Sequence, residues 1–269
     1  MASLTNLSFY QAQRSLASSQ SSLAQATQRL STGLRVNSAK DDAAGLAIAE
    51  RMNAQQRGMQ VAVRNANDGI SLAQTAEGAF VNAADSLQRM RELAVQARNA
   101  TNSDSDKDAL DAEFGQLASE VQRIFTGTTF NGKTIVGAQA GAQVFQIGAG
   151  TAAADSISIT TTNMSTQADI TKVAGTDLAG AGRAVIDNTS TATTLGTVID
   201  DIDKALDTVN AERATYGAIQ NRFDSVVKNL GTSIEQSTAA RSRIMDADFA
   251  TETANLAKYQ ILQQASASM

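Results

Sequence analysis

Residues 195–234 read LGTVIDDIDKALDTVNAERATYGAIQNRFDSVVKNLGTSI. Apolar side chains recur in this stretch at steps that alternate between four and three residues, which is the heptad pattern of a long coiled-coil helix. The chain has no proline, so no ring interrupts a helix of this length. The positions of the seam are Leu195, Ile199, Ile202, Leu206, Val209, Arg213, Tyr216, Gln220, Phe223, Val227, Leu230 and Ile234.

A second long helix is predicted from Asp41 to Ala97, about 85 Å at 1.5 Å per residue. Its start is indicated by the capping-box spacing of Ser38 and Asp41. Asn67-Asp68-Gly69 alone favours a turn, but the heptad register runs through it, so the helix is expected to be continuous. The seam positions are Met59, Val63, Ala66, Ile70, Ala73, Glu77, Phe80, Ala84, Leu87, Arg91 and Ala94.

Weaker patterns predict three further helices. A short one is expected to pack back on the second rod through Leu110, Phe114, Leu117, Val121 and Ile124. The two terminal helices have few apolar anchors among Ala, Ser and Gln, so each alone is marginal in water. Those anchors are Phe9, Leu16, Leu23 and Leu30 at one end, and Phe249 and Leu256 at the other.

Between the rods the period changes to two. Asn131-Gly132 lies between Thr128–Phe130 and Lys133–Ile135, which predicts a hairpin with a type I′ turn. Further short strands are expected around Val144–Ile147 and Ser156–Thr160. The Ser/Thr/Ala/Gly-rich stretch from residue 160 to 194 is expected to be a surface connection or a poorly packed excursion. The predicted fold class is therefore mainly α: long antiparallel coiled-coil helices forming a rod, a small hairpin region, and helical arms.

Composition excludes several chemistries. The 269 residues include no Cys and no His, which removes the usual zinc ligands, thiol nucleophiles and the His base of common triads. No catalytic residue, cofactor or metal is therefore expected. The formal net charge is −5, with the excess acid in the middle of the chain, so no nucleic-acid surface is expected. No long apolar run indicates membrane insertion or a signal peptide.

Four local features resemble functional sites, and each has a simpler explanation. Residues 104–108, DSDKD, open like a calcium loop, but the sixth position is Ala109 and the twelfth is Gly115, so acids at a helix start explain them better. The GAG of residues 148–150 lacks the helix that a dinucleotide fingerprint requires. Asn-x-Ser/Thr triplets such as those at Asn99, Asn163 and Asn188 occur frequently by chance. Arg91, Glu77 and Arg213 interrupt their seams and are expected at solvated rims, although polar residues buried in a seam can also set its register.

Two groups of sequence strings resemble bacterial flagellin. The first comprises QRLSTGLRVNSAKDDAAGLAIA at 28–49, RNANDGISLAQTAEGA at 64–79 and LQRMRELAVQ at 87–96. The second comprises GAIQNRF at 217–223, ARSRIMDADFA at 240–250 and QILQQA at 260–265. The resemblance covers residues 1–160 and 195–269.

The resemblance implies a subunit that assembles into the helical flagellar filament of a motile bacterium. It implies inner-tube assembly helices at 1–40 and 240–269, and a rod domain at 41–160 and 195–239. A short connection at 161–194 would replace the outer domains. The implied route is flagellar type III export to the cell exterior. The implied partners are copies of the same chain, an export chaperone, and cap and hook-associated proteins.

The resemblance also implies recognition by hosts. A Toll-like receptor is expected to bind at Arg89, Leu93 and Glu113, with Gln88 and Arg91 beside them, and plant pattern receptors at residues 28–49. The alternative is a merely solvated face beside the Leu87 seam.

The sequence departs from the family at both ends. It opens LTNLSFY from Leu4, without the usual Asn-Thr-Asn string, and ends ASASM, where relatives are expected to continue for several helical turns. Four alternatives stay open at this point: a hook–filament junction protein of the same family, a chemoreceptor-like coiled coil, a carboxylate-based enzyme, and an organelle transit peptide in the basic first 40 residues.

Overall fold

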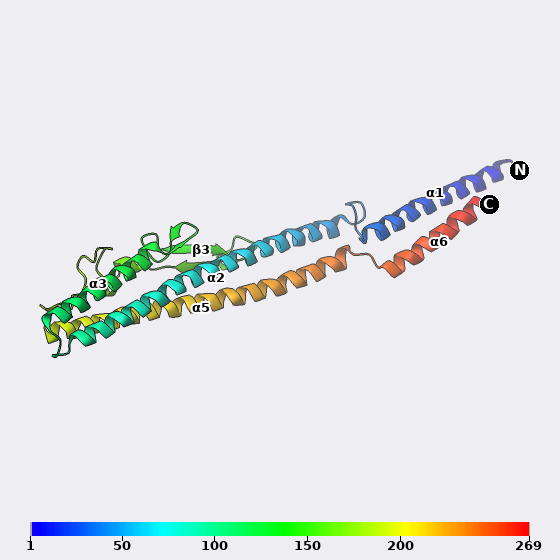
Figure 1. Cartoon of the computed structure of the whole chain (residues 1–269). Coiled ribbons are helices and arrows are strands. Elements are labelled where there is room, and N and C mark those ends of the chain that lie inside the picture. The colour runs from blue at the N-terminus through cyan, green and yellow to red at the C-terminus, as the bar shows by residue number, and fades with distance from the viewer. Residues whose placement is uncertain (1, 269) are drawn as a thin grey trace. The chain divides into compact units, whose positions relative to one another are not determined.

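The computed structural model describes residues 2–268 as two compact units, one up to Gly58 and from Thr232 onward, the other Met59–Gly231. The mainly α fold is confirmed (Figure 1). The helices are α1 (Ala2–Thr32), α2 (Ala43–Ala97), α3 (Asp104–Gly127), α4 (Ala168–Ala174), α5 (Ala192–Met245) and α6 (Phe249–Ser268), with 3-10 turns at Ala153–Asp155 and Met164–Thr166. The strands are β1 (Thr129–Phe130), β2 (Lys133–Thr134), β3 (Ala142–Gln146) and β4 (Ser156–Thr160).

Within the second unit, α2 and α5 pack antiparallel along the two predicted seams. The rings of Phe80 on α2 and Tyr216 on α5 lie 5.5 Å apart, and both side chains are buried. Phe223 is fully buried and meets Phe145 of β3 edge to face at 5.6 Å. These aromatic contacts contribute beyond the area that they bury, which matters in a chain with few aromatics.

α2 also buries a second stripe, which the heptad analysis missed. This stripe consists mostly of alanines, and the ring of Phe80, which lies on the predicted seam, also contacts that of Phe125 of α3 at 6.0 Å. A signal was present, because small residues recur every three or four positions beside the seam. The stripe comprises Leu72, Ala76, Ala79, Ala83, Met90, Leu93 and Ala97.

The polar residues that interrupt the seams have partners on the facing helices or nearby. Arg91 forms a two-point ion pair with Asp203, with Nε to Oδ1 at 2.6 Å, and both side chains are nearly half exposed. Gln220 donates to the Glu77 carboxylate at 2.7 Å. Both pairs join α2 to α5 at one register only. A shift of one helix along the other would break both pairs. They therefore favour the observed register, whereas apolar heptads alone allow several.

Residues 67–69, Asn-Asp-Gly, favour a turn but are helical here, and the packing at Gly69 explains why. A Cβ at Gly69 would lie 2.7 Å from the ring of Phe223, so the absence of a side chain lets α5 pack against α2. Burial of that ring stabilises the continuous helix more than the local sequence opposes it.

We expect Gly69→Ala to destabilise the protein by about 1 kcal/mol or more, because overpacking outweighs the better helix propensity of alanine. Gly78 of the same helix is the matched control. It is exposed, and a Cβ there meets nothing within 4 Å. Gly78→Ala should therefore stabilise by about 0.5–1 kcal/mol. Urea unfolding of both variants checks the signs, and equal effects would contradict this account.

The predicted hairpin and strands are present. β1 pairs with β2 in the register Phe130↔Lys133, and Asn131 and Gly132 have φ values of 50° and 77°, as a type I′ turn requires. β3 pairs antiparallel with β4. The glycines of the dinucleotide-like motif lie in the turn between these strands. A Cβ at Gly148 would collide with the Asp155 carboxylate, so packing accounts for that glycine.

The stretch from residue 160 to 194 is not a poorly packed excursion, which was one of the two alternatives expected for it. It contains α4, and it buries Met164, Ile170, Val173 and Ile186 in the main core. Arg183 binds the Asp111 carboxylate of α3 through both terminal nitrogens, at 2.9 and 2.6 Å. Asp111 also accepts the Ile186 N–H at 2.9 Å. The apolar residues that recur in this polar stretch were the sequence signal that it packs against the core.

α2 begins two residues later than predicted. The Asp41 carboxylate accepts the N–H groups of Asn37 and Ser38, which closes a turn before the helix. Asp42 is the residue that caps α2, through a 2.7 Å bond from the Gly45 N–H. The capping-box spacing of Ser38 and Asp41 therefore stabilises the turn that precedes α2 rather than the helix itself. The capping box of α3 is formed by Ser103 and Asp106, which is one of the calcium-like acids, and Asp104 lies in the same first turn.

Candidate assembly surface

The two terminal helices pack against each other in the first unit, where the N- and C-terminal ends lie side by side (Figure 1). Their large apolar side chains are mostly exposed. Leu7, Phe9 and Tyr10 on α1 are 62–66% exposed, and Ile261 on α6 is 65% exposed. Large apolar side chains left in water at this density are typical of helices that a partner covers. We call these four residues and Phe249, which is 56% exposed, the arm surface.

The predicted anchors of the arms lie partly in the α1–α6 contact. Leu16, Leu23 and Leu30 of α1 and Leu256 of α6 are half-buried. Ala26 of α1 is buried, and Glu252 of α6 is 7% exposed. The pair thus buries little apolar area, as expected from its composition, and the helices remain amphipathic without a full partner.

The segments that join the arms to α2 and α5 are tied to each other by backbone bonds. The Arg35 N–H donates to the Met245 carbonyl at 2.6 Å, and the Ala247 N–H donates to the Gly33 carbonyl at 2.9 Å. The Arg35 guanidinium also donates to the Ile244 carbonyl. A small core of Val36, Ala49 and Met245 lies beneath them. Residues 28–49 are therefore held in one fold rather than in an open loop.

Local hydrogen bonds lower the pKa of two carboxylates at these junctions, Asp41 and Asp248. The backbone N–H groups of Ser38 and Asn37 lower the pKa of Asp41. The Thr251 hydroxyl and the N–H groups of Thr251 and Ala250 lower the pKa of Asp248, which stands just before α6. Negative charge there also favours the N-terminus of α6.

The residues implied in host recognition separate into an exposed and a buried set. Arg89 reaches Glu92 and Glu113, with each nitrogen–oxygen pair at 2.9 Å, and all three side chains are about half exposed or more. Gln88 is exposed. Leu93 is 1% exposed and belongs to the core under α3, so its side chain adds no accessible surface in this conformation.

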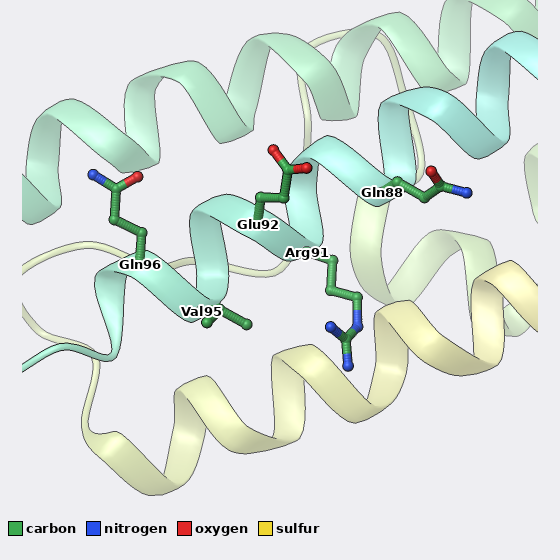
Figure 2. A pocket seen from close by; sticks show the side chains of 5 residues that line it. All are labelled: Gln88, Arg91, Glu92, Val95 and Gln96. Atoms are coloured by element: carbon green, nitrogen blue, oxygen red, sulfur yellow. The ribbon is translucent and has the colours of Figure 1, made fainter.

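A shallow groove of about 490 Å³ lies beside this ion-paired group. It is lined by Gln88, Arg91, Glu92, Val95 and Gln96, all of α2. Figure 2 shows Arg91 reaching toward α5, where Asp203 holds it. Val95 is 49% exposed and is the one apolar residue among the four polar ones that line this groove.

Within residues 2–268, no three His, Cys, Asp or Glu residues gather where they could hold a metal ion. None of the described helices is long and apolar enough to cross a membrane.

The fold and the arm surface define a class of protein: a coiled-coil chain whose terminal helices carry its largest unburied apolar side chains. Two family models match the chain. The bacterial flagellin N-terminal helical region matches residues 4–140, and the bacterial flagellin C-terminal helical region matches residues 199–269. The chain belongs to the bacterial flagellin family. It is a structural protein of the flagellar filament, which lies outside the cell and forms by self-polymerisation.

Individual relatives agree with the family models. A flagellin of Halalkalibacterium halodurans is 43% identical over 91% of this chain and 85% of its own length. Flagellin B of Vibrio cholerae is 34% identical over 98% of this chain and 94% of its own. The crystal structure of Bacillus cereus flagellin has a TM-score of 0.50 at 30% identity, covering 62% of this chain and 88% of that one.

Proposed function

We propose that this subunit serves motility, with residues 1–40 and 240–269 forming the inner tube of the filament. Residues 41–160 and 195–239 would form the surrounding rod domain, joined by the short connection 161–194. The observation that carries this proposal is the arm surface, because neighbouring subunits would bury side chains that the single chain leaves in water. Export chaperone, cap and hook-associated proteins are the further partners that the family implies.

The test is complementation of a bacterial strain that lacks its own flagellin. We expect the chain to be secreted, to form filaments visible by electron microscopy, and to restore swimming. Filaments without swimming would contradict the motility role alone, whereas secreted chain that never polymerises would contradict the whole proposal.

A second proposed role is recognition by host receptors, at Arg89, Glu113 and Gln88 for a Toll-like receptor and at residues 28–49 for plant receptors. It is supported by the exposed group in which Arg89 bridges Glu92 and Glu113 beside the groove. A guanidinium held between two carboxylates is already oriented, so little side-chain entropy is lost on binding. Leu93 would contribute only by supporting α2 from below.

We expect Arg89→Asp to weaken binding of the folded monomer to the Toll-like receptor at least about tenfold, since it places a third carboxylate beside Glu92 and Glu113. Helical content should barely change, because the substitution leaves the Leu87 seam intact. Arg123→Asp is the matched control, as Arg123 is an exposed arginine paired with Glu120 three residues away. Surface plasmon resonance measures the affinity of both variants for the receptor. If Arg89→Asp binds with wild-type affinity, the proposed recognition site is wrong.

A further inference from the structure

Two dipeptides of the chain have a chemical reactivity that filament assembly does not explain. They are Asp68-Gly69 in α2 and Asn131-Gly132 at the tip of the β1–β2 hairpin, and the sequence contains no other Asp-Gly or Asn-Gly pair. In each, the backbone nitrogen of the glycine can attack the side-chain Cγ of the residue before it, because glycine has no Cβ to hinder the approach. The attack closes a cyclic imide. The structure distinguishes between the two.

Helix α2 protects Asp68-Gly69. Gly69 is buried, and a Cβ there would lie 2.7 Å from the Phe223 ring. The pair lies near the middle of α2, where the backbone nitrogen is held in a helical hydrogen bond and cannot turn toward the side chain. Ring closure would require this packed part of the helix to unfold. The pair is therefore inert in the folded chain.

The tip of the hairpin gives Asn131-Gly132 no such protection. Both residues are exposed, and a Cβ placed on Gly132 meets nothing within 4 Å. The type I′ turn does not itself bring the Gly132 nitrogen to the Asn131 Cγ, so the tip has to open before the ring closes. Opening costs little free energy, because β1 and β2 have two residues each and a two-stranded ribbon is only marginally stable.

The base of the hairpin stays anchored while the tip opens. The Thr134 N–H donates to the Gln139 Oε1 at 3.0 Å, and the Gln139 N–H donates to the Thr134 hydroxyl at 3.1 Å. The Ile135 N–H donates to the Thr128 carbonyl at 3.2 Å, and the Ile135 side chain is buried. Opening can therefore be confined to residues 130–133, without unfolding of the core.

We propose that Asn131 is a site of spontaneous deamidation in the folded chain, with water as the second reactant. The Gly132 nitrogen gives up its proton and bonds to the Asn131 Cγ, the Cγ–Nδ2 bond breaks, and the side-chain nitrogen leaves as ammonia with a proton. Water then opens the imide. Attack at Cγ yields aspartate, and attack at the main-chain carbonyl carbon yields isoaspartate. This inference does not depend on the proposed function.

The two products differ in their effect on the hairpin. Aspartate keeps the turn, because Asp-Gly also suits a type I′ geometry. Isoaspartate routes the backbone through its side-chain carbons, so a two-residue turn no longer fits the register Phe130↔Lys133. Phe130 and Lys133 line a cavity of about 160 Å³ together with Leu72 and Phe145. The hairpin is thus loosely packed on the side where it would have to adjust.

The experiment incubates the purified full-length chain at mildly alkaline pH, which favours the amide anion that attacks. Isoaspartate is measured by enzymatic methylation and located by peptide mass spectrometry. Trypsin cleaves after Arg123 and Lys133 and so releases the site within one peptide. A second sample, unfolded in guanidinium, reports the reactivity of both dipeptides without the fold. Asn99 is the matched control, since it is exposed and is followed by alanine.

We expect Asn131 to react at least about ten times faster than Asn99 in the folded chain. Asp68 should give isoaspartate in guanidinium alone. Hydrogen exchange at residues 128–135 should rise in the isoaspartate product and stay unchanged in Asn131→Asp, which supplies the other product. If Asn131 reacts in guanidinium but not in the folded chain, the hairpin protects the site and the proposal is wrong. Equal isoaspartate at Asp68 and Asn131 in the folded chain would also overturn it.

Discussion

Replacing Leu7 and Phe9 with serine is expected to raise the critical concentration for filament assembly about a hundredfold. Both side chains are more than 60% exposed in the single chain, so their loss costs the monomer little. If neighbouring subunits bury them, each contributes about 1.5 kcal/mol or more to association, and together this corresponds to two orders of magnitude. Sedimentation after seeding with short wild-type filaments gives the critical concentration.

The matched control is Val144→Ser on β3. Val144 is 67% exposed, like the arm residues, but it lies outside the arms, so its replacement should leave the critical concentration unchanged. Deleting residues 1–36 or 240–269 is the stronger form of the same test. It should abolish filaments while the α2–α5 pair of the second unit remains folded by circular dichroism. Normal polymerisation of either deletion would refute the assigned role of the arms.

Replacing Arg183 with glutamine is expected to lower the free energy of unfolding by about 2–3 kcal/mol. This lies between the small contribution of exposed ion pairs and the larger penalty for breaking fully buried ones, because the Arg183 and Asp111 side chains are 20% and 15% exposed. The variant leaves Asp111 in a partly desolvated site with only the Ile186 N–H to compensate. Guanidinium unfolding of the monomer measures the change.

The same pair predicts a pH dependence with a definite sign. Burial of Asp111 opposes its ionisation, but hydrogen bonds from Arg183 and the Ile186 N–H outweigh burial and lower its pKa. A carboxylate whose folded pKa lies below the unfolded value of about 3.9 stabilises the fold fully above that value. The contribution is lost as the pH falls through the folded pKa. The difference in the free energy of unfolding between wild type and Asp111→Asn should therefore become smaller as the pH falls from about 7 to about 3.

Lys204→Gln is the control for both measurements, since Lys204 pairs with Asp201 on the surface of α5. Its loss should leave the unfolding midpoint nearly unchanged at either pH. If the free energies of unfolding of wild type and Asp111→Asn differ by the same amount at both pH values, the ionised carboxylate does not stabilise the 161–194 connection.

The amino-acid sequence alone determined the long helices, the hairpin and the family. Heptads are local and regular, so the seams of α2 and α5 appear in the spacing of Phe80, Leu87, Val209 and Phe223 without any knowledge of their partners. The Asn131-Gly132 turn is equally local, because two adjacent residues with positive φ fix it. The weak apolar content of the arms likewise predicted helices that need a partner.

Only the tertiary structure decided which residues meet. The pairing of Arg29 with Glu252 spans 223 positions and that of Arg183 with Asp111 spans 72, and no periodicity links such positions. Burial of Leu93 depends on the packing of the main core, to which α3 and α5 also contribute. Packing of the 161–194 connection depends on the ion pair between Arg183 and Asp111 of α3. The physical reason is common to all of them: charge and close packing act between neighbours in space, whereas spacing along the chain records only which side of a helix a residue occupies.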